Sequence, residues 1–148
     1  MKNPYTVKGS NKVRAYEPVL PLYNAPYFIY IGNTVRDAAD GAQLELGKRF
    51  DPKITPNTGA KAISMEHPEK GVSYVILLGI DIQLDIFTVA AHEALHLSWW
   101  MLDDRGVELS PENHEAQAYV LQDIFGELKN AIEEYNKFYK PVIKIKKK

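Results

Sequence analysis

The chain has 148 residues, of which 45% are hydrophobic and 25% are charged, and its formal net charge is −1. This length fits one domain with an ordinary core, and the balanced charge gives no general attraction to nucleic acid or to a membrane surface. Cysteine is absent, which excludes disulfides and thiolate metal ligands. Any metal must therefore be held by His, Asp or Glu side chains.

The start of the chain, residues 1–5, contains no apolar signal core. The longest apolar run extends from Val72 to Ile80 and is much shorter than the roughly 20 residues that a membrane-spanning helix needs. We therefore expect a cytoplasmic protein, bacterial or made by a phage in its host, with no membrane contact. Residues 5–26 are rich in Pro and Tyr and predict irregular structure wrapped around the domain.

The next elements are predicted from local composition. Residues 27–31 have the composition of a strand that ends at Gly32, and Thr34 is placed to cap a helix over residues 35–46. Gly41 weakens this helix prediction. Residues 61–65 and 72–78 read as two strands, and the turn residues 67–71 between them indicate a hairpin.

Two long helices complete the chain. Asp85 is placed to cap an apolar helix over residues 86–102, and Ser110-Pro111-Glu112 has the pattern of a second helix start, leading to about residue 137. We expect a single α+β domain over residues 1–140, in which a small mixed sheet packs against two or three helices. Residues 141–148 form a basic tail, predicted to be solvated; contact of its lysines with nucleic acid or an acidic partner is the alternative.

The motif His92-Glu93-Ala94-Leu95-His96 matches H-E-x-x-H within the first long helix. Residues i and i+4 lie on one helix face, so the two histidines can bind one ion. Glu93 is turned by about 100° from His92, which lets its carboxylate reach a water beside that ion. This pattern predicts a zinc site with Glu93 as the base. The alternative is two histidines at the edge of the core with a solvent-facing Glu93.

A catalytic zinc ion needs a third protein ligand. The longer pattern with a third histidine after the helix fails, because Trp99 and Leu102 occupy its glycine and histidine positions. Four other residues remain open as the third ligand: Asp103, Asp104, His114 and Glu115. We favour Glu115, which follows His96 by 19 positions and lies near the start of a helix that can pack against the first. An acid favoured by the helix dipole is the alternative explanation for Glu115.

The motif residues 92–96 together with residues 110–124 resemble small phage- and prophage-encoded H-E-x-x-H proteins and, more distantly, zinc peptidases of the ImmA/IrrE type. The resemblance implies a zincin-like fold of the gluzincin kind, a metallopeptidase activity, and Glu115 as third ligand. It implies no substrate. One position departs from thermolysin-like enzymes, since Tyr119 stands where they place an Asp that orients a zinc-bound His. A supporting carboxylate must come from elsewhere, for instance Asp123.

A peptidase also needs a hydrogen-bond donor for the oxyanion of its intermediate. Tyr119 shares a helix face with Glu115 and is our candidate for this donor, with His114 and Arg105 as alternative donors. The structural explanation for Tyr119 is that it is an aromatic residue of the core. Trp99 and Trp100 are expected in the core and in the wall of the pocket. Residues 72–78 are our candidate for a sheet-edge strand that pairs with an extended substrate, an ordinary internal strand being equally possible.

These features predict a zinc-dependent peptidase that acts on an unidentified protein or peptide. The alternative is a binding module that keeps the fold, and perhaps the zinc, without turnover, and acts on a host or regulatory protein. Nucleic-acid binding through the basic tail is disfavoured by the near-neutral net charge. The oligomeric state and the identity of the native metal are left open by the sequence.

Overall fold

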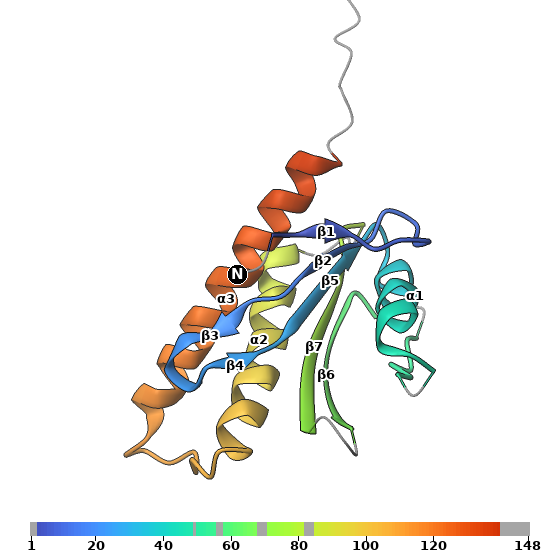
Figure 1. Ribbon diagram of the computed structural model, residues 1–148. Coiled ribbons are helices and arrows are strands. Elements are labelled where there is room, and N and C mark those ends of the chain that lie inside the picture. The colour runs from blue at the N-terminus through green and yellow to red at the C-terminus, as the bar shows by residue number, and fades with distance from the viewer. Residues whose placement is uncertain (1–2, 49, 56–57, 68–70, 82–84, 140–148) are drawn as a thin grey trace, which may run out of the picture.

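A computed structural model describes residues 3–48, 50–55, 58–67, 71–81 and 85–139 (Figure 1). It confirms an α+β arrangement with a mixed sheet and three α-helices. The elements, in chain order, are β1 (Tyr5–Thr6), β2 (Arg14–Tyr16), β3 (Val19–Leu20), a 3₁₀ turn (Pro21–Tyr23), β4 (Ala25–Pro26), β5 (Phe28–Gly32), α1 (Val35–Leu46), β6 (Ala60–His67), β7 (Gly71–Gly79), α2 (Ile86–Asp103) and α3 (His114–Phe138).

The main sheet has five strands in the order β1-β2-β5-β7-β6. β5 and β7 are parallel, with Phe28 opposite Val75 and Gly32 opposite Gly79, and every other pair in this sheet is antiparallel. β7 therefore lies inside the sheet, and β6 is the edge strand next to it, with β1 at the opposite edge. The prediction that residues 72–78 form a strand at the edge of the sheet was therefore wrong. They form an internal strand, which was the alternative.

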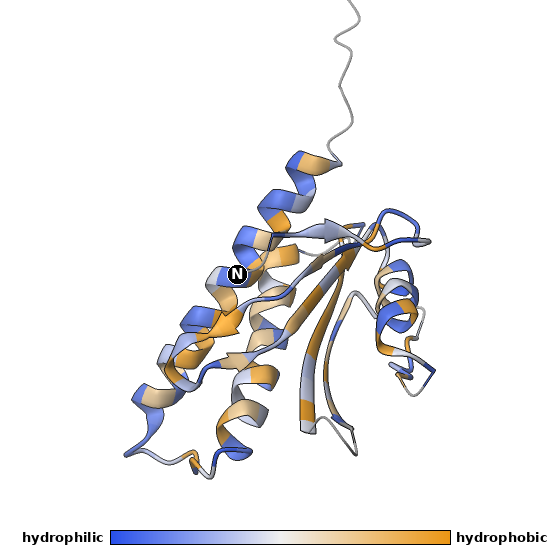
Figure 2. Cartoon of the chain, viewed as in Figure 1, coloured by the Kyte–Doolittle hydropathy of each residue, from blue (hydrophilic) through white to orange (hydrophobic). Residues whose placement is uncertain are grey.

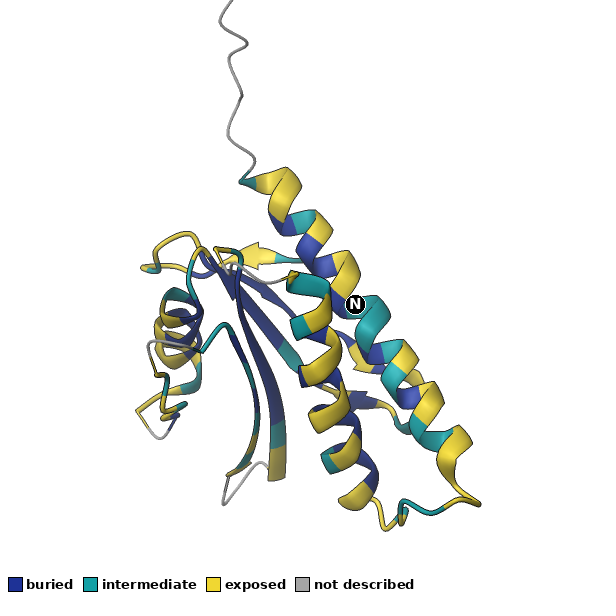
Figure 3. Ribbon diagram, turned by 180° about the vertical axis from the view of Figure 1, so that it is seen from behind, coloured by how far each residue is buried: buried dark blue, intermediate teal, exposed yellow. Residues whose placement is uncertain are grey.

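Helices cover both faces of the sheet, with α1 on one face and α2 and α3 on the other (Figure 1). Side chains alternate between the two faces along a strand. In β5, Ile29 and Ile31 contribute to the core beneath α2 and α3, whereas Tyr30 contributes to the core beneath α1. Because both faces are buried, β5 and β7 are apolar almost without interruption (Figure 2), and in Figure 3 they lie as a buried layer between the helices.

α1 begins as predicted. The Thr34 side chain accepts a hydrogen bond from the backbone N–H of Asp37, and the Asp37 carboxylate accepts one from Thr34. Gly41 does not interrupt the helix, because Val13 packs directly against it: a Cβ atom at position 41 would lie 2.8 Å from a methyl group of Val13. The glycine that weakened the prediction is thus required by close packing.

Two predictions about element boundaries were wrong. Residues 5–26 are not irregular but contain β1 to β4, strands of two or three residues that are too short to show a periodic pattern. The second long helix begins at His114 and not at Ser110, because Ser110 accepts a hydrogen bond from the N–H of Asn113 in a separate turn. The predicted basic tail and most of the predicted β6–β7 turn lie outside the described residues.

None of the helices in the described part of the chain is both long and apolar enough to cross a membrane.

Candidate metal centre

α2 presents two histidines to solvent from adjacent turns. The Nε2 atoms of His92 and His96 lie 3.1 Å apart, and their ring centroids are separated by 4.8 Å. Two nitrogens bound to one tetrahedral zinc ion at about 2.0–2.1 Å each would lie roughly 3.3 Å apart. The separation of the two nitrogens is therefore close to that of two corners of a zinc site. At this distance one ring can also donate a hydrogen bond to the other.

The rotation of α2 about its axis decides where the motif residues point. The side of α2 that packs on the sheet and on α3 is fixed by a buried apolar stripe, formed by Ala90, Ala94, Leu97 and Met101. This stripe turns His92 and His96 outward. The ring of His96 also stacks on Trp100, with centroids 5.8 Å apart and planes at 23°, which restricts its orientation.

Glu93 lies at the boundary between the buried stripe and the histidine face. The residue is only 8% exposed, and its Oε2 accepts a hydrogen bond from the backbone N–H of Ala62 at 2.7 Å. Among the described residues, none donates a hydrogen bond to Oε1. The alternative of a solvent-facing Glu93 is therefore wrong: the carboxylate is anchored on edge strand β6 by one oxygen.

A hollow of about 330 Å³ lies between α2 and the edge strand and is lined by Glu93, His96 and Trp100. Trp100 is thus in the pocket wall, as expected, but Trp99 is 52% exposed and does not belong to the core. The other walls come from β6 and the segment before it, and consist of Lys53, Thr55, Thr58, Ala60, Lys61 and Ala62. Sequence reasoning missed these residues, because they lie some 30 to 40 positions before the motif and form no local pattern with it.

The predicted third ligand does not join the histidines. Glu115 is the second residue of α3, its side chain is 75% exposed, and its Oε1 lies 3.7 Å from Nδ1 of His114. Within the described ranges no three His, Asp or Glu side chains are grouped closely enough to hold a metal ion. Of the alternatives, Asp104 accepts a hydrogen bond from the hydroxyl of Tyr74. The structure thus brings His92 and His96 together on α2 beside Glu93, and places Glu115 apart from them.

Tyr119 faces a different hollow, of about 480 Å³, whose other walls include Leu22 of the 3₁₀ turn and Asp123. The residue is 67% exposed, so it is not a core aromatic. Tyr119 does not line the hollow of Glu93 and His96, and its role as oxyanion donor stays a prediction. Arg105 donates to the backbone oxygen of Met101 at 3.0 Å.

Searches of known protein families, curated proteins and solved structures found no match to this chain.

Proposed function

We propose that the protein is a zinc-dependent peptidase in which His92 and His96 hold the metal and Glu93 is the general base. The observation that carries the proposal is the pair of Nε2 atoms 3.1 Å apart on α2, one residue away from a carboxylate buried against the edge strand. A purely structural zinc site is commonly closed by four protein ligands and does not need such an acid.

When bound, zinc supplies Lewis acidity and lowers the pKa of water to about 7. Glu93 divides its two oxygens between two tasks. Oε2 is held by the N–H of Ala62, which fixes the plane of the carboxylate. Oε1 is left to take a proton from water and later pass it to the leaving amine, as a general base that becomes a general acid.

The edge strand supports an extended peptide as substrate. Along a strand, the backbone N–H and C=O groups of successive residues point alternately to one side and the other. Those of Ala60 and Ser64 therefore point away from β7, as those of Ala62 do. An extended chain can pair with such an edge through main-chain hydrogen bonds. Because the hollow of Glu93 and His96 borders Ala60 and Ala62, this pairing would bring a peptide bond beside the proposed base.

Glu115 enters the proposal as third ligand through its spacing from His96 and its place on the helix that packs against α2. Its carboxylate is exposed and is not grouped with the histidines in this structure. Its role is therefore tested directly by measuring how much the affinity for zinc falls when Glu115 is replaced.

Glu93→Gln and His96→Ala together test the proposal. We expect the purified wild-type protein to bind about one zinc ion per chain and His96→Ala to lose it. Glu93→Gln should keep zinc, but cleavage of unfolded protein substrates should fall by about a hundredfold or more, the scale for losing a positioned general base. Equal zinc content in wild type and His96→Ala would refute the site. Zinc binding without cleavage by the wild type would favour the binding module.

A further inference from the structure

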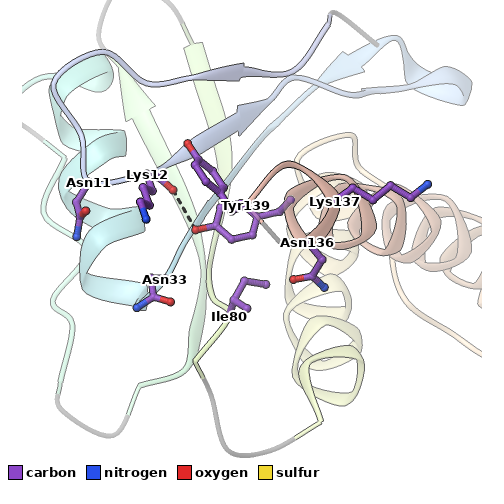
Figure 4. A pocket seen from close by; sticks show the side chains of 8 residues that line it. Asn11, Lys12, Asn33, Ile80, Asn136, Lys137 and Tyr139 are labelled. Atoms are coloured by element: carbon purple, nitrogen blue, oxygen red, sulfur yellow. Dashed lines mark hydrogen bonds between the residues drawn. The ribbon is translucent and has the colours of Figure 1, made fainter. Parts of the chain in front are cut away.

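A further hollow, of about 640 Å³, lies beyond the carboxyl ends of β5 and β7 and shares no lining residue with the hollow of Glu93 and His96 (Figure 4). We call it the strand-end crevice. Its floor contains Asn33 and Ile80, the residues that directly follow β5 and β7. Its volume falls in the range of about 300–1,000 Å³ that small-molecule sites occupy.

The position of the strand-end crevice in the topology is informative. β5 and β7 are parallel neighbours, but the chain leaves β5 towards α1 on one face and leaves β7 towards α2 on the other (Figure 1). Open α/β sheets bind ligands, nucleotides in particular, outside the carboxyl ends of the strands at such a switch point. The floor is firmly held, since Ile80 N–H donates to Gly32 O at 3.0 Å and Asp81 N–H to Asn33 O at 2.9 Å.

The walls combine carboxamides with aromatic rings. Asn11, Asn33 and Asn136 are all exposed and come from three separate segments. Each carboxamide carries both donors and an acceptor, the combination that pairs with the edge of a nucleobase. Tyr135 and Tyr139 close the crevice on the side of α3, with ring centroids 4.9 Å apart; tyrosine rings are stacking partners for bases.

Two lysines line the crevice, Lys12 and Lys137, and the Lys137 side chain extends away from Asn11 and Asn33 (Figure 4). The backbone of Lys12 has φ +54°, a left-handed conformation that lysine rarely adopts, and its carbonyl accepts a hydrogen bond from Tyr135 Oη at 3.0 Å (Figure 4). The ammonium group of Lys12 lies on the side of Asn11 and Asn33 (Figure 4). No carboxylate is among the described lining residues, but Asp37 lies next to them and accepts a hydrogen bond from the Asn11 amide at 3.4 Å. The first turn of α1 is capped by its own Asp37, so we assign an anion in the crevice to Lys12, the lining lysine on the side of Asn11 and Asn33 (Figure 4).

We infer that the strand-end crevice binds a mononucleotide, with its phosphate at Lys12 and its base among the asparagine side chains and Tyr139. The switch point favours a ligand at this place, and the combination of a lysine, carboxamides and aromatic rings in the lining favours a mononucleotide. The inference does not rest on the proposed peptidase activity, because the two hollows are separate.

The test is calorimetric titration of the full chain with AMP, adenosine and inorganic phosphate. Wild type should bind AMP at least tenfold more tightly than either adenosine or phosphate. Lys12→Gln removes the positive charge and leaves a polar side chain that is one bond shorter, so it should weaken AMP binding more than tenfold while leaving adenosine unchanged. Asn136→Ala lies on an exposed helix position where alanine is the better helix former, and should weaken AMP and adenosine alike.

Two matched controls localise the binding. Lys129→Gln removes an exposed lysine of α3 outside the crevice and should bind AMP as wild type does. His96→Ala should also bind AMP normally, which separates this crevice from a phosphate held by zinc at the histidines. No AMP binding at millimolar concentration, phosphate binding as tight as AMP binding, or full AMP binding by both Lys12→Gln and Asn136→Ala would each overturn the inference.

Discussion

The carboxylate of Glu93 accepts a hydrogen bond from the backbone N–H of Ala62, 31 residues earlier in the chain. This bond joins the motif helix to the edge strand and satisfies an N–H that β7 does not pair. Glu93 thus has a structural role as hydrogen-bond acceptor in addition to its proposed role as base. Different substitutions at this position can separate the two roles.

Glu93→Ala should destabilise the protein by about 1–3 kcal/mol, because it leaves a buried N–H without an acceptor. Glu93→Gln should cost clearly less, since its amide oxygen can still accept from Ala62. Urea unfolding of both variants without zinc measures the difference. Equal stabilities of the two variants would mean that the bond to Ala62 contributes nothing to the fold.

The second prediction concerns the ion pair between β2 and α3. Arg14 is 6% exposed, and its Nε and Nη2 each lie 2.6 Å from an oxygen of Glu134; its guanidinium also lies 3.8 Å from the ring centroid of Phe138. Hydrogen bonding to Glu134 raises the pKa of Arg14.

Arg14→Ala should therefore cost about 2–3 kcal/mol, in the upper range for hydrogen bonds to charged groups, measured by chemical unfolding. Arg14→Lys, the matched control, keeps the charge but cannot form the two parallel bonds, so it should recover only part of the loss. Full recovery by lysine would show that charge alone matters here.

The third prediction concerns pH. Burial, followed by the charge of Asp123, raises the pKa of Glu127 above its ordinary value of 4.5. The folded protein thus holds this proton to higher pH than the unfolded chain, and the free energy of unfolding falls as pH rises from 4.5 through the raised value. Among the residues that the structure describes, the buried Oε2 of Glu127 and the hydroxyl of Tyr27 also have no hydrogen-bond partner.

Glu127→Gln should gain stability relative to wild type as the pH is raised from 4 to neutral, because glutamine has no charge to bury. Thermal unfolding across that range measures the gap. Glu133→Gln, at an exposed position of the same helix, should follow the wild-type profile. A gap that stays constant with pH would contradict the burial of this carboxyl group.

The fourth prediction tests the third ligand. Even the loss of an outer-shell partner costs about 10- to 100-fold in metal affinity, so Glu115→Gln should weaken zinc binding by roughly a hundredfold if Glu115 is a direct ligand. His114→Ala and Glu112→Gln should change it little. Competition with a chromophoric chelator gives these affinities. The reverse ranking of Glu115 and His114 would assign the ligand to His114.

Elements with strong local signals could be predicted from the sequence. The capping pair Thr34 and Asp37, the cap at Asp85 and the β6–β7 strands follow from residues close together in the chain, and the structure confirms them. β1 to β4 could not be predicted, because strands of two or three residues exist only through pairing with distant segments, as Arg14 does opposite Ile31.

The sequence by itself determined that His92 and His96 share one helix face, because the period of the helix alone places residues i and i+4 together. Only the tertiary structure decided that Glu93 is buried on Ala62, that Trp99 is exposed, and that Tyr119 faces another hollow. The physical reason is that helix rotation is set by burial of an apolar stripe against partners distant in the chain. A single sequence reveals the apolar stripe but not which elements pack against it.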